Sequence, residues 1–493
     1  MKFPSLLYKE NTVRALIEPQ VFDDVRLSAL VAGDVLRCSL PVCTAEDISC
    51  RREMFVCAED EAFRAALKRL ADGCADIAFY AEAGERARTA EEKNVIFLSL
   101  SRAMLGFYRL AASLTAPAKC DFTVRLSEYF QAELSKDYIK RMTAKLDELL
   151  SAASAITHNS NLFRIRGERL RIAQGNAESF TDIISRCAEN LSLTPPDSGA
   201  PLSAPLSENI ISGIASLHPA DFDAFAQFAA DFGAFYSPDI LRYCGELNFY
   251  LGFCEVRDRA RRAGIPVCYP EITDERVIAL RDAYDLSLLT KDEMKIIPND
   301  ISFDADAPFC YLTGANGGGK TTYLRTVGVA VLTAMLGCPV ACEGGRLYIP
   351  HGVYTHFPRD ERFDKTGRFA DEQNRVDAIL AAADDRSLVL LNETYSTTGE
   401  ESAVRLTSAL AERLWSMGAY GIYITHQHSI SESHIPYLNV VVDRSDANRR
   451  TYKVERRRDD AGSFAHDVLE KYSLTPAALE KRFAASANGG NDR

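Results

Sequence analysis

The fold is decided by the stretch FCYLTGANGGGKTTYLR, which runs from Phe309 to Arg325. Residues 309–313 have the short apolar pattern of a buried strand, and residues 323–336 have the longer apolar pattern of a helix. Between them, residues 314–321 match GxxxxGK[ST] in the strand–loop–helix context that this motif requires. A glycine-rich turn with an incidental lysine would need neither the strand nor the helix. The sequence therefore predicts a phosphate-binding loop.

Each residue type in this loop suits a bound phosphate. The glycines let backbone N–H groups turn inward, and the N-terminus of the following helix adds its positive dipole end. Lys320 is expected to reach the β- and γ-phosphate oxygens, and Thr321 to give its hydroxyl to Mg²⁺. The residues predicted to bind the nucleotide are Gly314, Asn316, Gly317, Gly318, Gly319, Lys320 and Thr321.

A second strand should bring an acidic group to the metal and to the attacking water. Residues 387–391 form such an apolar run, and Asn392 and Glu393 follow it directly. Glu393 is predicted to orient or deprotonate the water, and Asn392 stands where an aspartate would normally hold Mg²⁺. An amide keeps the acceptor oxygen but removes the charge. This predicts weaker Mg²⁺ binding and slower hydrolysis, unless Thr321 and the phosphates hold the metal adequately.

A third apolar run, residues 421–425, ends at His426. Ligands of open α/β folds bind at this edge of the sheet, so His426 is predicted to sense the γ-phosphate. His428 and His434 follow closely, but no cysteine or acidic residue completes a recognisable metal-ligand spacing. We therefore expect no metal cluster there.

The two parts of the chain differ in pattern. From residue 296 onward, the apolar runs 309–313, 387–391, 421–425 and 440–443 alternate with helical patterns, which predicts a mostly parallel, doubly wound sheet. The upstream part is mostly helical, with predicted helices in 59–113, 222–235 and 239–263. Gly264 and Pro266 should end the last of these helices. The chain is thus expected to hold more than one domain.

Two upstream segments leave alternatives open. Apolar residues in 139–156 follow 3-4-3-4-3 spacing, which suits either a long helical arm or an ordinary bundle helix. Residues 163–172 alternate apolar and basic residues around Gly167, so they form either a basic hairpin that contacts phosphates or a solvated charged face. Residues 193–209 are rich in Pro, Ser, Gly and Ala and should form an exposed linker.

Composition restricts the function further. The 493 residues include 57 Lys+Arg and 69 Asp+Glu, so a net charge of −12 argues against coating nucleic acid through overall charge, although a local basic surface remains compatible. Early charged residues and the lack of an eighteen-residue apolar run predict a cytoplasmic protein with no membrane contact. Thirteen cysteines without a CxxC pair predict reduced thiols rather than disulfides or a zinc site.

The loop resembles that of the MutS family, the DNA mismatch repair ATPases. Family members usually read TGPNMGGKSTYLR where this chain reads TGANGGGKTTYLR, with Thr321 for the family's Ser. The upstream Ile297-Pro298-Asn299-Asp300 is similar to the family's V-P-N-D. The positions that match directly within the loop and its helix are Gly314, Asn316, Gly318, Gly319, Lys320, Thr322, Tyr323, Leu324 and Arg325.

The resemblance continues downstream with departures. Residues 369–372 and 379–380 are similar to the family's S-T-F-M-x-E stretch, whose start reaches the partner subunit's nucleotide, but Gly367 replaces the family's Ser. This implies nucleotide contacts for Phe369 and Glu372, in addition to Thr322. SLVLLNET resembles SLVLMDE with Asn392 for Asp, and His426 fits the family's A-T-H. These departures indicate a divergent branch in which trans activation and hydrolysis are altered.

The resemblance also implies a domain plan and a function. Residues 1–295 would form a helical core with lever arms (arm about 121–192, linker about 193–209), and 296–493 an α/β P-loop NTPase domain with C-terminal helices. We expect a short member without the N-terminal mismatch-reading domain. It would be a homodimer with composite ATP sites, using ATP and Mg²⁺ and clamping duplex or branched DNA in repair or recombination. The alternative is a nucleotide-gated interaction protein that hydrolyses ATP very slowly.

Overall fold

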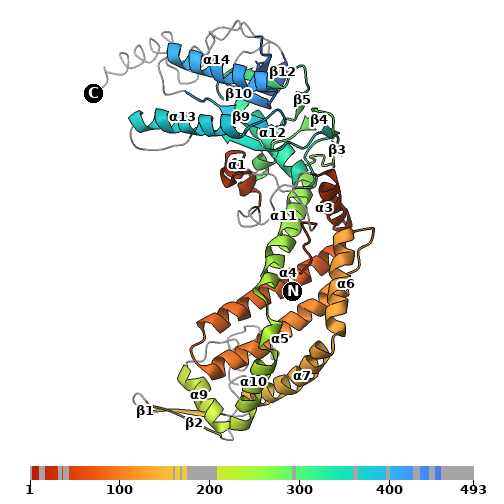
Figure 1. Cartoon of the computed structure of the whole chain (residues 1–493), viewed down its shortest axis with the longest axis vertical. Coiled ribbons are helices and arrows are strands. Elements are labelled where there is room, and N and C mark those ends of the chain that lie inside the picture. The colour runs from red at the N-terminus through yellow and green to blue at the C-terminus, as the bar shows by residue number, and fades with distance from the viewer. Residues whose placement is uncertain are drawn as a thin grey trace, which may run out of the picture. The chain divides into compact units, whose positions relative to one another are not determined.

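The computed structural model describes residues 3–9, 17–31, 36, 44–158, 161–166, 169–174, 208–290, 296–358, 365–395, 400–425, 434–442 and 450–456. They belong to two compact units, which are described separately (Figure 1). Unit 1 comprises Met1–Tyr8 and Glu53–Leu251, and unit 2 comprises Lys9–Arg52 and Gly252–Arg493. The division falls inside helices α3 (Ala45–Cys57) and α11 (Arg242–Arg262). Each unit combines segments that are separate in the sequence, so the units do not test the domain boundary expected near residue 295, which stays a prediction.

Unit 1 is built from helices, as its sequence predicts. Its described helices are α4 (Glu61–Arg86), α5 (Ala90–Ala112), α6 (Asp121–Ser135), α7 (Asp137–His158), α9 (Glu208–Leu217) and α10 (Pro219–Phe232), with the first part of α11. Short 3₁₀ turns, η2 (Gly233–Phe235) and η3 (Pro238–Leu241), join α10 to α11. The linker expected over 193–209 lies outside the described residues up to 207, and α9 begins at Glu208.

Side-chain caps set where the long helices begin. The Asp60 carboxylate accepts a hydrogen bond from Phe63 N at 2.8 Å, and the Thr89 hydroxyl accepts one from Glu92 N at 3.2 Å. Each cap satisfies an N–H that the helix itself leaves without a partner. Helix α5 has the length and apolar composition of a membrane-spanning helix, yet half of its most apolar window is buried inside the protein.

Helix α7 carries the apolar seam predicted from spacing. Its six positions are all buried: Ile139, Met142, Leu146, Leu149, Ala153 and Ile156. The helix packs against α5, α6 and α10. Contact with three neighbouring helices favours the bundle-helix interpretation over a two-helix arm.

The N-terminal peptide completes the core of unit 1. Glu246, buried in α11, accepts hydrogen bonds from Ser5 Oγ and Leu6 N, both at 2.7 Å. The Phe3 ring stacks on Phe130 at 6.0 Å between centroids, and Phe130 meets Tyr108 edge-on at 4.6 Å. A buried carboxylate with two donors and an aromatic cluster together fix this peptide on the helices.

The predicted basic hairpin exists in the backbone. Strands β1 (Asn161–Arg166) and β2 (Arg169–Gln174) pair antiparallel, with Arg164 opposite Arg171 and Arg166 opposite Arg169. Because opposite residues share a face and alternate residues return to it, all four arginine positions lie on one face of the ribbon. The other face holds the apolar positions Phe163, Ile165, Leu170 and Ile172.

Unit 2 contains a six-stranded sheet in the order β12-β11-β6-β10-β9-β8. Its strands are β6 (Phe309–Thr313), β8 (Val353–His356), β9 (Leu388–Asn392), β10 (Tyr420–Ile424), β11 (Tyr437–Val442) and β12 (Arg450–Arg456). The pairs β11–β6, β6–β10, β10–β9 and β9–β8 are parallel, and β11–β12 is antiparallel. The α/β pattern expected downstream of the helical part is therefore present.

Helices cover both faces of this sheet. Helix α12 (Lys320–Met335) lies on one face, where Gly328 approaches Leu390 of β9. Helices α13 (Lys365–Ala382) and α14 (Glu400–Met417) lie on the other, in a core with Tyr311, Val389 and Leu391 (Figure 1). Because neither face meets water, every residue of β9 and β10 is buried, which explains their continuous apolar sequences.

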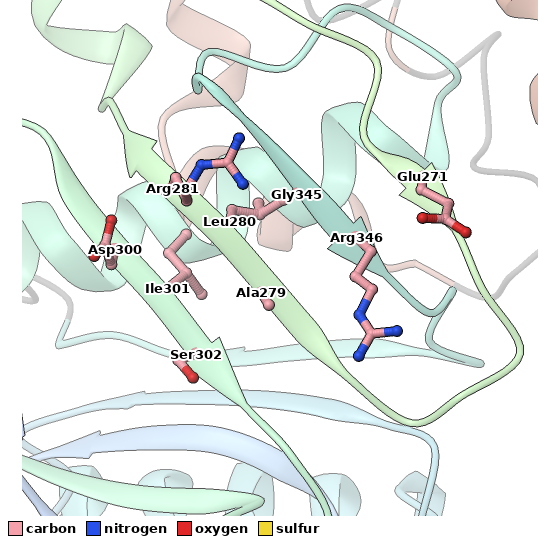
Figure 2. Close-up of a pocket in the computed structure, with 9 residues that line it drawn as sticks. All are labelled: Glu271, Ala279, Leu280, Arg281, Asp300, Ile301, Ser302, Gly345 and Arg346. Carbon is pink, nitrogen blue, oxygen red and sulfur yellow. The ribbon is translucent and has the colours of Figure 1, made fainter.

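A second, four-stranded sheet was not anticipated from the sequence. It has the order β3-β7-β4-β5, formed by β3 (Glu271–Ile272), β4 (Ile278–Ala283), β5 (Asn299–Phe303) and β7 (Gly344–Leu347), and the 3₁₀ turn η4 (Leu286–Thr290) follows β4. An open hollow of about 490 Å³ lies over these strands. Figure 2 shows the residues that line it, among them Arg281, Arg346, Glu271 and Asp300. None of the residues lining it belongs to the predicted nucleotide site.

An N-terminal segment packs on α12, which sequence patterns did not indicate. Helix α1 (Pro19–Asp24) leads into the 3₁₀ turn η1 (Leu27–Ala29), and Asp24 O accepts a hydrogen bond from Arg325 Nε at 3.1 Å. The Asp24 carboxylate accepts another from Thr355 Oγ1 at 2.6 Å. At the far end of α12, the fully buried Arg51 donates to Leu336 O at 3.2 Å. Residues near the N-terminus thus secure both ends of this helix.

Candidate functional site

The loop between β6 and α12 has the backbone that its glycines allow. Gly314 has φ +126°, and Gly319, the N-cap residue of α12, has φ +101°. Glycine is required at position 318 for a different reason, because a Cβ there would lie 2.9 Å from Ala315 O and 3.0 Å from Val440 Cγ1. Left-handed backbone and close packing both exclude other side chains here. The predicted loop and the start of α12 at Lys320 are therefore found in the structure.

Lys320 lies inside the curve of the loop. Its Nζ donates to Gly314 O at 2.8 Å, to Ala315 O at 3.2 Å and to Asn316 Oδ1 at 3.4 Å, and the residue is 6% exposed. Burial lowers the pKa of Lys320 to about 8, although the negative charge of Glu393 opposes this shift. The ammonium group is held in place by neutral oxygens. An anion that enters this site would stabilise the charged form of the lysine.

Asn392 and Glu393 lie where β9 ends, as the sequence predicts. Asn392 pairs with Ile424 of β10 in parallel register and is buried. Among the residues that the structure describes, none donates a hydrogen bond to its Oδ1. Glu393 has φ +54°, and its N–H donates to Ile424 O at 3.1 Å. A glutamate with a left-handed backbone conformation at the end of a strand is strained, and such strain occurs at functional sites.

A hydrogen-bond chain behind Glu393 was missed by the sequence analysis. His356, at the end of β8, is buried, and its Nδ1 lies 3.0 Å from Thr394 Oγ1. Thr394 O accepts from Tyr423 OH at 2.9 Å, and that hydroxyl lies 3.0 Å from Thr407 Oγ1. These hydrogen bonds fix Thr394, the residue that follows Glu393. No local pattern marks it, because the four residues come from separate elements.

Tyr452 is a second residue that the sequence analysis missed. Its ring lies against the loop, such that a Cβ on Gly319 would be 3.3 Å from Tyr452 Cδ1, yet the residue is 47% exposed. Asn299 belongs to the segment that is similar to the family's V-P-N-D. It holds this part of β12 by donating a hydrogen bond to Tyr452 O at 3.0 Å and accepting one from Val454 N at 2.8 Å. An exposed aromatic ring beside a phosphate-binding loop can stack on a base.

Of the remaining predicted site residues, some lie in the described part of the chain and others lie outside it. Thr321 and Thr322 begin α12 and are partly buried, and Glu372 is buried in α13. Phe369 and Gly367 lie in the backbone of α13, and the Phe369 side chain is outside the described part. His426, His428 and the C-terminal helices expected in 296–493 also lie outside it. Within the described ranges, no group of three potential metal-ligating residues occurs.

These features define an α/β domain with a glycine-rich loop between a parallel strand and a helix, and with polar residues at the end of another strand. Residues 310–473 match the family model "MutS domain V". Over these residues the chain is similar to the MutS family, as its loop sequence suggests.

Similar proteins support this assignment. The chain is 32% identical over 190 residues to DNA mismatch repair protein MutS 1 of Halobacterium salinarum, which covers 37% of this chain and 21% of the relative. It is 27% identical over 221 residues to DNA mismatch repair protein MSH2 of Saccharomyces cerevisiae (44% and 22%). It is 28% identical over 220 residues to DNA mismatch repair protein MutS of Fervidobacterium nodosum (43% and 25%). The matches thus span about a fifth to a quarter of these relatives.

Proposed function

We propose that this protein is an ATP-dependent DNA-binding protein, in which a MutS-type P-loop NTPase domain (296–493) follows a helical core and lever region (1–295). The observation that carries the proposal is Lys320, a buried ammonium group held by loop oxygens at the start of α12. Such a group is costly to bury and is stabilised when a polyphosphate enters the loop. The names of the similar proteins, DNA mismatch repair proteins, support the DNA-related role.

Each residue of the site has a role in this proposal. Lys320 neutralises the β- and γ-phosphates, and the loop N–H groups bind the same oxygens. Glu393 positions the attacking water and accepts its proton, while the His356–Thr394 contact keeps the adjacent backbone in place. His426 contacts the γ-phosphate. Tyr452 stacks on the base, which the exposed ring beside Gly319 supports.

The residues fit a magnesium ion, the metal expected with ATP. Buried Asn392 Oδ1 has no hydrogen-bond donor among the described residues, and an amide oxygen is a ligand that Mg²⁺ or its bound water accepts. Thr321 would supply a hydroxyl beside it. When bound, Mg²⁺ neutralises phosphate charge. With an amide in place of a carboxylate, the site holds the metal less strongly and hydrolysis is slow.

We further propose a homodimer with composite ATP sites. Helix α13 carries Gly367, Phe369 and Glu372, which match the family stretch whose start reaches the partner subunit's nucleotide. Gly367 at the family's Ser position removes a hydroxyl from this contact. The activation of one site by the other subunit should accordingly be weak.

The β1–β2 ribbon is the proposed DNA contact in unit 1. Four arginine positions on one face, in a chain of net charge −12, form a local basic surface that suits a phosphate backbone. Replacing Arg164 and Arg171 by Gln should weaken DNA binding and reduce the slope of log K against log salt by about one for each lost phosphate contact. Arg86→Gln, which removes an exposed arginine paired with Glu82, is the matched control.

Asn392 favours a second candidate function, a nucleotide-gated interaction protein in which ATP is bound but hardly hydrolysed. The acceptor oxygen is retained, so the loop still binds a nucleotide, while the charge that usually holds the metal is lost. In this case the bound nucleotide acts as a structural switch, and a protein partner detects the change.

The test is ATP binding and steady-state ATP hydrolysis with Mg²⁺, alone and with linear, mismatched or four-way-junction DNA at two salt concentrations. Lys320→Ala should abolish ATP binding, and unchanged affinity would refute the site. Glu393→Ala should retain binding and lose turnover. Stimulation by one DNA form, weakened by salt, supports the first function. Tight ATP binding with no turnover on any DNA supports the second, and a monomer at micromolar concentration with ATP contradicts the shared site.

A further inference from the structure

Two cysteines far apart in sequence meet in unit 2. Cys268 Sγ lies 3.3 Å from Cys342 Sγ. The contact is fixed by the backbone, because Cys268 exchanges two 2.9 Å hydrogen bonds with Val340, and Cys342 N donates to Val340 O at 3.0 Å. A disulfide needs an S–S distance of about 2.05 Å. The two sulfur atoms are therefore about 1.3 Å short of bonding distance.

The surroundings favour a thiolate at Cys268. The pKa of the Cys268 thiol is lowered, chiefly because Cys342 donates a hydrogen bond to it, and the positive charges of Arg52 and Arg281 act in the same direction. The hydrogen bond with Cys268, and after it burial, raises the pKa of Cys342 instead. Cys268 is half-buried and Cys342 is buried. The pair therefore has the asymmetry of an attacking thiol and a resolving thiol.

Other close thiols in the described part lack this charge environment. Cys74 hydrogen-bonds with Cys244, and Cys57 with Cys120. The charged neighbours that act on these pairs are carboxylates, Glu246 on Cys74 and Glu53 on Cys57, and they raise the thiol pKa. The hydrogen bond with Cys74 also lowers the pKa of the Cys244 thiol, but no arginine in the described part adds to this effect as Arg52 and Arg281 do at Cys268. Since only a thiolate attacks a disulfide, both of these pairs should react more slowly.

We propose that Cys268 and Cys342 form a reversible redox site that is oxidised by low-molecular-weight disulfides such as oxidised glutathione. The Cys268 thiolate attacks one sulfur of glutathione disulfide, which forms a mixed disulfide and releases one glutathione thiolate. The Cys342 thiol loses its proton to solvent and attacks Cys268 Sγ, which forms the Cys268–Cys342 bond and releases the second glutathione thiolate. Both electrons pass to glutathione. The bond joins the segment after α11 to the segment after α12, independently of any nucleotide.

The test uses the full chain, reduced, desalted and incubated with glutathione disulfide, then alkylated and digested without reductant. Mass spectrometry should find a Cys268–Cys342 cross-linked peptide that dithiothreitol removes. In Cys342→Ser, the mixed disulfide of Cys268 with glutathione should accumulate, since no thiol resolves it. Failure to find either species would overturn the proposal. So would a Cys74–Cys244 linkage that forms as fast as the Cys268–Cys342 linkage.

Arg281 and Arg346 provide a matched pair of variants, because both are exposed arginines beside the hollow in Figure 2 and only Arg281 acts on the two thiols. Arg281→Gln should slow formation of the Cys268–Cys342 bond about two- to fivefold, through a smaller thiolate fraction. Arg346→Gln, which loses an ion pair with Glu275, should leave the rate unchanged. Equal rates for the two variants would overturn the proposed role of charge.

Discussion

The low pKa of Lys320 makes nucleotide binding depend on pH in a way that can be calculated. In the free protein the pKa of Lys320 is about 8, because the ammonium group is buried. Bound phosphates favour the charged form and should return the pKa to its ordinary value of 10.5 or above. This recovery corresponds to about 3 kcal/mol of coupling between the proton and the nucleotide. Binding must then take up a proton wherever the free lysine is partly neutral.

The sign and size of the pH dependence of nucleotide affinity follow from these two pKa values. Affinity should be nearly constant below the free pKa and fall about tenfold for each pH unit above it, until the pKa of the complex is reached. Proton uptake per nucleotide should be about 0.1 at pH 7, 0.5 at pH 8 and 0.9 at pH 9. The terminal phosphate of ATP titrates at about pH 6 to 7, so the uptake at pH 8 and pH 9 is the part that reports on Lys320.

Isothermal titration calorimetry measures this uptake from the enthalpy of ATP binding in buffers of different ionisation enthalpy. Lys453→Gln is the control, because this exposed lysine interacts with Pro298 O and Asp282 and not with the loop. The variant should keep the wild-type proton uptake. Tight binding with constant uptake near zero from pH 7 to about 9 would refute the argument from burial. No binding at all would instead refute the nucleotide site.

Three further predictions concern separate parts of the molecule. Asn392→Asp should raise the apparent Mg²⁺ affinity and the rate of ATP hydrolysis, and a magnesium titration with unchanged midpoint and rate would show that the amide is not the limiting group. Tyr452→Ala should weaken ATP binding by about 1–2 kcal/mol while Tyr452→Phe should not, as measured by equilibrium binding; equal losses would exclude stacking. Leu146→Ala should lower the unfolding free energy of unit 1 by about 2–5 kcal/mol in urea titrations, whereas Lys145→Ala on the exposed side should change it by less than about 0.5 kcal/mol.

The parts of the fold that the sequence predicted are those with local signals. Residues 309–313 were predicted to be a strand and match β6, because a buried strand between two covered faces leaves a continuous apolar run. The loop at 314–319 was predictable because its backbone requires glycine. The α7 seam was equally clear, but its spacing alone did not show whether it would pack in a bundle.

The parts that the sequence did not predict depend on contacts between distant residues. The β3-β7-β4-β5 sheet is assembled from segments on both sides of β6 and α12, and its strands are short and partly exposed. Tyr452 acquires its position from Asn299, which lies far upstream. His356 meets Thr394 only because β8 and β9 are neighbours. Such residues have no local signature, since their roles arise from tertiary packing.

The packing of the N-terminal segment on α12 has a consequence for synthesis of the chain. Asp24 and Arg51 leave the ribosome well before their partners Arg325, Thr355 and Leu336, which are translated roughly three hundred residues later. Contacts of such sequence separation form late, because a long loop must close first. A fragment starting at residue 296 would lack these partners and leave α12 exposed to water. We therefore expect the side chains of residues 17–31 that pack on α12 to require protection by chaperones until α12 has been translated.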